Sequence, residues 1–408
     1  MTEHPRSGAP RDLRRANTAA ALRSVLDEGP LPRADLAARL GLAQGTISRI
    51  VGPFVGAGVL RELPAMTGGG GRPRVPLDLA PAARLTVGLH IGRQRTSAGL
   101  VDLRGTVRAW LTHERGGPAA PEDLIPGAAD LVRRLLAEAG GTPVLGIGAA
   151  TGGWVDPVRG TVVDNEALGW RDVPLRALLT EATGQDTYVD SGARAHATAE
   201  VWFGRARTAG CSVHLFTGNV IDAAVAIGRR VHPGARFAAG TVAHLPVTGL
   251  DGTAGPGDTT AACACGRRGV LQAVATDSAV LAEATRRGLA TGGEDGAPGG
   301  LPRLAALARQ GDEAADGLLR ARARHIGTAV THLVELLDPD LVVLSGGVLA
   351  VPDHLEEVRR AAAERLGPSW DPEHVQPTAL GAHSLAAASA ALLLRAYYDD
   401  PLAFEDFG

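Results

Sequence analysis

The first residues of this 408-residue chain that could do chemistry are Cys263 and Cys265, two of its three cysteines. Three cysteines are too few for a disulfide framework, so this pair indicates reduced thiols or a metal ion. All 41 basic residues are arginine and none is lysine, which we attribute to a high-GC coding bias. The absence of lysine excludes a P-loop lysine, a Schiff-base lysine and any lysine general base.

A second set of chemically useful side chains lies near the N-terminus and comprises Gln44, Thr46, Ser48 and Arg49. Glutamine can pair bidentately with adenine, arginine can bind guanine or phosphate, and hydroxyl groups can contact phosphate or a thymine methyl. These short polar side chains and one arginine therefore suit the major groove of duplex DNA.

Three predicted helices would position these polar side chains. Apolar residues recur at helical spacing in three successive segments, and glycine ends the first two of them. The segments are Asn17–Leu26, which stops at Gly29-Pro30, Arg33–Leu40, which turns at Gly41, and Ala43–Val55. In the last, the apolar side chains would pack inward while the four polar ones project outward, as in a helix-turn-helix.

Arg72 and Arg74 lie in a glycine-rich stretch that we interpret as the tip of a hairpin, or wing. Residues 1–75 carry 11 arginines and 6 acidic residues, whereas the rest of the chain carries 30 and 38, so a basic front precedes an acidic body. Together these features favour double-stranded DNA as the partner, although a helical interaction or dimerisation module with a glycine linker is the alternative. The aromatic content of 3% argues against single-strand readout by stacking.

No segment of the sequence predicts secretion or a membrane partner. The first fifteen residues are polar and rich in arginine, and the longest apolar stretches, such as Ser384–Leu394, are shorter than the ~20 residues of a membrane span. We therefore expect a cytoplasmic protein.

The acidic remainder predicts an α/β fold, because strand-like and helical segments alternate along it. The predicted strands are Leu85–His90, Ser97–Val101, Val144–Ala149, Val213–Thr217, Ala223–Ile227 and Leu341–Ser345. The predicted helices are Pro121–Ala139, Ala193–Trp202, Val270–Thr285, Asp312–Leu337, Leu355–Leu366 and Leu385–Tyr398, with loops at Leu250–Thr259 and Ala290–Pro302.

Several motifs, in order along the chain, resemble those of the ROK family of repressors, open reading frames and kinases. They are Gly71-Arg72-Pro73, Gly88-Leu89-His90-Ile91-Gly92, Leu168-Gly169-Trp170, His244-Leu245-Pro246-Val247, Cys263-Ala264-Cys265-Gly266 and Ser345-Gly346-Gly347. The resemblance implies a winged helix-turn-helix over residues 10–78 and a sugar-kinase-like domain over 84–398. It also implies that this domain has two actin-like ATPase (ribonuclease H-like) lobes, about 84–200 with the C-terminal helix and about 205–380.

The sequence departs from the kinases of that family at the positions that would hold ATP and sugar. His90 and Arg93 disrupt the first phosphate loop, and Asn219 to Asp222 replace the glycines of the second. The position of the catalytic base is Gly192, and Asp190 could replace it only through a register shift. Sugar-binding positions fall on Ala167, Thr241 and Gln272. We therefore expect no catalysis and no ATP or Mg²⁺.

The resemblance also implies a zinc site, because His244, Cys263 and Cys265 match three of the four zinc ligands of family repressors. The fourth position is Val270, which cannot bind a metal, and Asp258 or His232 could replace it. The alternative is two reduced cysteines that stabilise a loop. His244 is also the one residue that we assign to a ligand cleft.

We interpret the chain as a DNA-binding transcriptional regulator of the repressor type. It would bind double-stranded operator DNA as a homodimer or homotetramer, and a degenerate, non-catalytic kinase-like domain would take a small sugar-like effector. Two alternatives stay open: an ATP-dependent sugar kinase with an appended DNA-binding domain, and an interaction scaffold that does not bind DNA.

Overall fold

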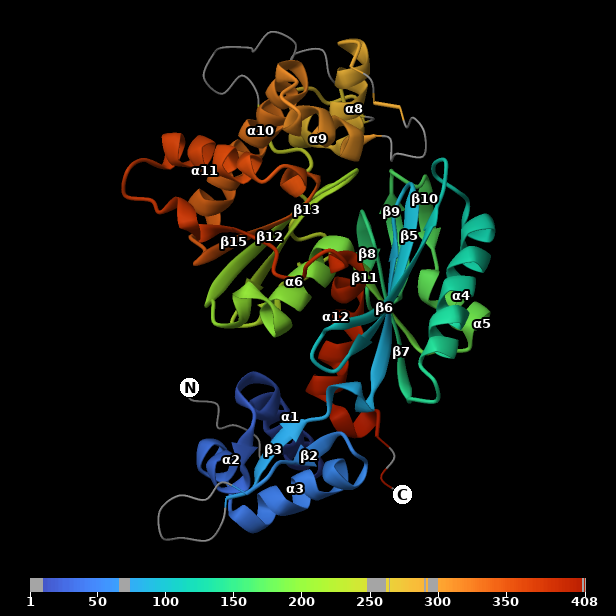
Figure 1. Ribbon diagram of the computed structural model, residues 1–408, viewed down its shortest axis with the longest axis vertical. Coiled ribbons are helices and arrows are strands. Elements are labelled where there is room, and N and C mark those ends of the chain that lie inside the picture. Colours follow the sequence, from blue (N-terminus) through green and yellow to red (C-terminus); the bar gives the residue numbers. More distant parts are fainter. Residues whose placement is uncertain are drawn as a thin grey trace.

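A computed structural model describes residues 10–65, 74–247, 262–263, 265–289, 291–292, 300–405 and 407. Its elements form three groups, which Figure 1 shows with the N-terminal unit at the bottom and two lobes above it. We call residues 10–79 the N-terminal unit, the sheet that contains β4 lobe 1, and the sheet that contains β12 lobe 2, each sheet with its helices.

The N-terminal unit contains the three helices that apolar spacing predicts. They are α1 (Pro10–Glu28), α2 (Arg33–Leu40) and α3 (Gln44–Gly56), and they pack on a sheet of order β1-β3-β2, formed by β1 (Leu31–Pro32), β2 (Leu60–Glu62) and β3 (Pro76–Leu79). Gly41 ends α2 with a φ of 63°, the left-handed conformation that glycine adopts without steric cost. This residue turns the chain from α2 into α3.

Lobe 1 is a five-stranded mixed sheet of order β11-β7-β4-β5-β6. Its strands are β4 (Leu85–Ile91), β5 (Arg95–Asp102), β6 (Val107–Glu114), β7 (Val144–Thr151) and β11 (Thr187–Ser191). Helix α4 (Pro121–Glu138) covers one face and α12 (Ser384–Asp399) covers the other, so the end of the chain returns to lobe 1. A small sheet of β8 (Trp154–Asp156), β9 (Thr161–Asn165) and β10 (Trp170–Val173) adjoins helix α5 (Leu175–Thr183).

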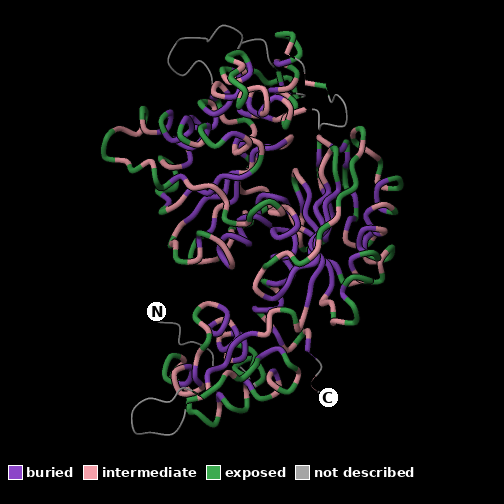
Figure 2. The backbone as a smooth tube through the Cα atoms, in the orientation of Figure 1, coloured by how far each residue is buried: buried purple, intermediate pink, exposed green. Residues whose placement is uncertain are grey.

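Lobe 2 is a second five-stranded sheet, of order β14-β13-β12-β15-β16, with helices on both faces. Its strands are β12 (Cys211–Thr217), β13 (Ile221–Ile227), β14 (Arg230–Val231), β15 (Leu341–Gly346) and β16 (Val375–Pro377). Helices α10 (Glu313–Leu337) and α11 (Asp353–Leu366) bury Ile326 and Val358 against the sheet. Helix α6 (Gly192–Phe203) lies between the lobes, packing on α12 and on β12 and β13, and Figure 2 shows it buried.

The structure confirms the predicted strands and most of the predicted helices, with differences around lobe 2. The segment Val270–Thr285, predicted as one helix, is two: α7 (Leu271–Ala275) and α8 (Asp277–Arg286). Thr276 adopts an extended backbone between them and its hydroxyl caps α8 by accepting the Ala279 backbone N–H, which apolar spacing alone does not predict. The predicted loop at Ala290–Pro302 ends in α9 (Leu301–Arg309), and the loop at Leu250–Thr259 lies outside the described residues.

Among the described residues, no helix has both the length and the apolar content that a membrane span requires.

Candidate functional site

Helix α3 presents the polar residues predicted to contact DNA on its outer face. Ile47 is completely buried in the core of the N-terminal unit, whereas Gln44, Ser48 and Arg49 are exposed and Thr46 is half-buried. The Arg49 side chain bonds only within α3, to the Gly45 carbonyl at 3.4 Å and the Thr46 hydroxyl at 3.5 Å, and no described carboxylate pairs with it. Its guanidinium group is therefore available to a base or a phosphate.

Of the two arginines in the predicted wing, only Arg74 lies within the described residues. Arg72 lies outside the described residues. Arg74, just before β3, pairs with Asp35 on α2, and both side chains are about half exposed. Because an exposed pair of this kind contributes about 0–1 kcal/mol, a phosphate could displace Asp35 from Arg74 at little cost.

The C-terminal end of α1 is held by both lobes at once. From lobe 2, Arg229 pairs with the Asp27 carboxylate at 2.7 Å, and Arg207 donates to the Asp27 carbonyl at 2.8 Å. From lobe 1, Arg104 donates to the Leu26 carbonyl at 3.4 Å and pairs with Asp78 of β3 at 2.6 Å. We call this set of contacts around Leu26 and Asp27 the α1 clasp.

A single apolar cluster runs from the N-terminal unit into the body. Leu22 and Phe54 belong to the same buried cluster as Trp202 of α6 and Tyr398 of α12. The Tyr398 hydroxyl donates to the Leu103 carbonyl at 2.7 Å, and the Arg229 guanidinium lies 5.0 Å from the centre of the Trp202 ring. Movement of the lobes therefore has a direct physical route to α1.

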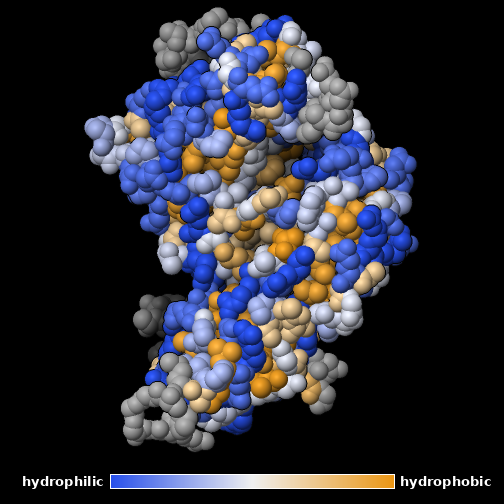
Figure 3. Space-filling view, viewed as in Figure 1, coloured by the Kyte–Doolittle hydropathy of each residue, from blue (hydrophilic) through white to orange (hydrophobic). Residues whose placement is uncertain are grey.

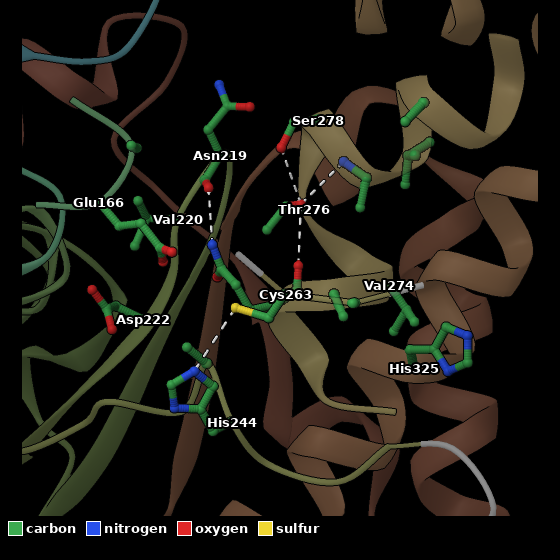
Figure 4. Close-up of a pocket in the computed structure, with 18 of the residues that line it drawn as sticks. Glu166, Asn219, Val220, Asp222, His244, Cys263, Val274, Thr276, Ser278 and His325 are labelled. Atoms are coloured by element: carbon green, nitrogen blue, oxygen red, sulfur yellow. Dashed lines mark hydrogen bonds between the residues drawn. The ribbon is translucent and has the colours of Figure 1, made fainter. Parts of the chain in front are cut away.

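A cavity of about 1260 Å³ opens between the two lobes. Figure 3 shows the surface hollowed there, and Figure 4 shows side chains from both lobes turned into it. Lobe 1 contributes Arg93, Trp154 and Glu166, whereas lobe 2 contributes Asp222, His244 and others. The cavity is large enough for a small ligand, because such sites measure roughly 300–1,000 Å³.

Asp190, which lies two residues before the predicted position of the catalytic base, forms a buried ion pair. Asp190 accepts the Nε–H of Arg194 at 2.7 Å, and Arg194 also donates to the carbonyls of Phe237 and Val155. The Arg194 side chain is buried, so Asp190 neutralises it and is not free to accept a proton from a ligand. A Cβ added at Gly192, in the same turn, would lie 3.9 Å from Nε2 of the His90 ring.

The cavity wall that replaces the second phosphate loop carries Asn219, Val220 and Asp222. Burial raises the pKa of Asp222 to about 7, and the nearby Arg194 and a hydrogen bond from Gly153 oppose that rise. Near neutral pH the Asp222 carboxyl is therefore partly protonated and can donate as well as accept a hydrogen bond.

Three buried histidines meet between the lobes: His90 of β4, His196 of α6 and His214 of β12. The rings of His196 and His214 stack with centroids 5.0 Å apart, and each of the three rings has one nitrogen without a hydrogen-bond partner. Burial lowers the pKa of His90 to about 3 and that of His196 to about 4, and it lowers the pKa of His214 as well. All three are neutral at physiological pH.

The structure brings the predicted metal ligands together. The donor atoms of His244, Cys263 and Cys265 all lie within 4.8 Å of one another, and His244 Nε2 is 3.3 Å from Cys265 Sγ and 3.9 Å from Cys263 Sγ. Val270 is buried and pairs with Pro246 in an isolated β-bridge. Among the described residues His232 does not join this cluster, and Asp258 lies outside them.

One imidazole and two thiolates are a donor set that suits zinc, and in these residues they converge without rearrangement. Burial raises the pKa of Cys263, and the negative charge of Glu166 adds to that rise. The backbone N–H of Arg267 lowers the pKa of Cys265, which favours its thiolate. The third cysteine, Cys211, is the first residue of β12 and is not part of the cluster.

Sequence patterns do not reveal the α1 clasp, the histidine cluster or the position of Glu166 in the cavity wall. Asp27 and Arg229 are 202 positions apart, so no local pattern could pair them. The substitution at His90 does mark the first phosphate loop as altered, but His196 and His214 read as ordinary residues of a helix and a strand.

Comparison with known proteins places these features in a family. The model of the ROK family matches residues 86–396. A transcriptional regulator of Mycobacterium tuberculosis is 33% identical over 96% of this chain and 89% of its own.

Solved structures agree with this placement. The crystal structure of a ROK family transcriptional regulator, a homologue of the Escherichia coli MLC protein, covers 95% of this chain and 97% of its own, with a TM-score of 0.74 and 21% identity. A ROK glucokinase from Streptomyces griseus with glucose and AMPPNP covers 75% of this chain and 98% of its own, with a TM-score of 0.63 and 27% identity. With three quarters of its length matched by the family model, the chain belongs to the ROK family.

Proposed function

We propose that this protein is a DNA-binding transcriptional regulator of the repressor type, with α3 as its recognition helix. The observation that carries the proposal is the outer face of α3, where Gln44, Ser48 and Arg49 are exposed above a buried apolar face. The name of the mycobacterial relative, which aligns over nearly the whole chain, supports it. Double-stranded operator DNA is the partner, and a homodimer or homotetramer would place two α3 helices in successive major grooves.

The two-lobed body acts as a sensor rather than a kinase. Asp190 is held by Arg194, and Val220 and Asp222 stand where the resemblance implies the glycines of the second phosphate loop, so both the base position and the phosphate cradle of a kinase are altered. The cavity would instead hold a small sugar-like effector near His244. No feature of the described cavity favours the alternative of an ATP-dependent sugar kinase with an appended DNA-binding domain.

The α1 clasp connects effector binding to DNA binding. Because Arg104 and Arg229 reach α1 from different lobes, a ligand that favours one degree of closure also favours one placement of the N-terminal unit. In a dimer this would change the separation of the two recognition helices.

Zinc at His244, Cys263 and Cys265 belongs to the same proposal. The metal would fix the loop that carries His244 to the cysteine segment, at the edge of the effector cavity. The role that we propose for the ion is structural or regulatory rather than catalytic.

A mobility-shift assay with the DNA upstream of the protein's own gene tests the proposal. Arg49→Ala should weaken specific binding by about 1–3 kcal/mol, or roughly 5- to 160-fold, because it removes one base or phosphate contact. Replacing both Arg72 and Arg74 by alanine should reduce the slope of log affinity against log salt by about 2.

The matched control is Arg133→Ala, which changes an equally exposed arginine on α4 of the body. Its affinity for DNA should equal that of the unchanged protein. If Arg49→Ala and Arg133→Ala behave alike, α3 does not read DNA. ATP turnover with a panel of hexoses would revive the kinase alternative.

A further inference from the structure

The cluster of His244, Cys263 and Cys265 offers a metal three protein ligands, and no fourth donor from the described residues joins them. Zinc in a structural site takes four, in a tetrahedron. The family's fourth position is Val270, which is buried and carries no donor atom. Among the described residues, a fourth ligand would have to come from across the cavity, and the alternatives are water or Asp258, which lies outside those residues.

Four carboxylates line the same cavity, and three of them already have partners. Asp164 lies 3.6 Å from Arg171, Glu283 pairs with Arg287 at 2.6 Å, and Asp222 is buried beside Arg194. The fourth is Glu166, whose carboxylate has no ion pair or hydrogen bond to any described residue.

Glu166 lies at the tip of the β9–β10 hairpin of lobe 1, and its side chain is exposed to the cavity. Asn165 anchors this turn by accepting the Leu168 backbone N–H and donating to Thr151 at 3.0 Å. In Figure 4, Glu166 extends from the strand at the left, whereas His244 and Cys263 come from the opposite lobe.

The geometry points to Glu166 as the fourth ligand, supplied by lobe 1 to a zinc ion that lobe 2 holds through His244, Cys263 and Cys265. Glu166 is not within the cluster of donor atoms in this structure, so the bond forms as the cleft closes. The metal ion is then bound by residues of both lobes and joins them. It stabilises the closed cleft because only the closed form offers four ligands.

This inference rests on the proposed zinc site but not on DNA binding. It predicts that zinc binding favours closure of the two lobes. Because the α1 clasp connects both lobes to α1, zinc binding would then also change the placement of α1. A site confined to lobe 2 would leave closure unchanged.

The test uses the full-length protein, reduced and stripped of metal, with Zn²⁺ and its spectroscopic substitute Co²⁺. We expect Co²⁺ to give the intense absorption of a tetrahedral thiolate site, and Zn²⁺ to reduce the radius of gyration measured by small-angle X-ray scattering. Glu166→Gln keeps the side-chain shape and removes the charge. It should lower zinc affinity more than tenfold, because even changes to groups that only support metal ligands cost about 10–100-fold. It should also abolish the zinc-dependent compaction.

The matched control is Asp164→Asn, which removes a carboxylate from the same hairpin and cavity. It should leave metal affinity and compaction unchanged, whereas Cys265→Ser should abolish both. If Glu166→Gln binds zinc and compacts like the unchanged protein, or if Asp164→Asn shows the same losses, Glu166 is not the ligand. If the unchanged protein binds neither metal, the zinc site itself fails, and the mobility shift of Arg49→Ala still judges the DNA-binding proposal separately.

Discussion

At the scale of single residues, the centre between the lobes holds one buried ion pair and three uncharged rings. Arg194 and Asp190 form a buried ion pair, and His90, His196 and His214 place three neutral rings between the lobes. Neutral imidazoles tolerate burial, but imidazolium ions would repel one another there, and Arg95 and Arg115 would add to the repulsion of His90. The centre is therefore built for one protonation state.

The histidine cluster predicts a loss of stability in acid. The pKa values of His90 and His196 in the folded protein are about 3 and about 4, below the value near 6.5 in the unfolded chain. The contribution of these histidines to the free energy of unfolding is therefore fully present above pH 6.5. It should fall by about 1.4 kcal/mol per pH unit for each histidine as the pH drops from 6.5 toward 4.

Denaturant unfolding at several pH values measures this slope. His196→Asn should flatten it by about one histidine's share, whatever the variant's stability at pH 7. His113→Asn, on the exposed face of β6, should keep the full slope. Equal slopes for all three proteins would show that the buried rings do not control acid stability.

At the scale of secondary structure elements, the helix-turn-helix depends on one glycine and on the burial of one face of α3. Gly41 has a φ of 63° and its N–H bonds back to the carbonyl of Ala37, so the turn needs left-handed backbone. This conformation costs other residues about 1–2 kcal/mol. The geometry of α2 and α3 is thus set by backbone conformation as much as by packing.

Gly41→Ala should therefore destabilise the protein by about 1 kcal/mol, although an added Cβ would meet nothing within 4 Å. Gly45→Ala is the control, since Gly45 has the same free space but lies in α3, where alanine is favoured over glycine by roughly 0.5–1 kcal/mol. Thermal unfolding without DNA should show a lower midpoint for the first variant and no loss for the second. The opposite order would mean that space, not backbone conformation, limits the turn.

At the scale of the whole molecule, the N-terminal unit is packed into the body rather than tethered to it. Its apolar cluster includes Trp202 and Tyr398, and its α1 helix is held by arginines from both lobes. Figure 1 shows α12 running from lobe 1 down to this unit, so the end of the chain supports its beginning. A rigid connection of this kind transmits small lobe movements.

Residues 10–82 expressed alone should consequently unfold at a lower temperature than the N-terminal unit of the intact chain. Removing the body exposes Leu22 and its neighbours to water, at about 25 cal/mol per Å² of apolar surface. Hydrogen exchange of α1–α3, measured at rising temperature in the fragment and in the whole protein, makes the comparison. Equal protection in the two would disprove the shared core.

Asp27→Asn should loosen the α1 clasp while leaving α3 intact. It removes the charge that pairs with Arg229, a partly exposed contact, so we expect a loss of about 1 kcal/mol and faster hydrogen exchange at the C-terminal end of α1. Asp12→Asn, in the first turn of the same helix, is the control and should leave exchange at that end unchanged. If the two variants exchange alike, the clasp does not hold α1.

The sequence by itself determined the local features. The spacing of apolar residues predicted α1, α2 and α3, and the glycine at position 41 marked the turn between α2 and α3. The residue types at 244, 263 and 265 predicted a metal site, and their donor atoms do lie together. These signals are local, because helical period, backbone freedom and ligand chemistry depend on near neighbours and residue type.

Only the tertiary structure decided the long-range features. It paired Asp27 with Arg229, stacked His196 on His214, and set Glu166 across a cavity from the cysteines. It also ended a predicted helix at Thr276, where a side-chain cap outweighs apolar spacing. Such contacts join residues tens to hundreds of positions apart, so they arise from how the lobes pack, which no local sequence pattern records.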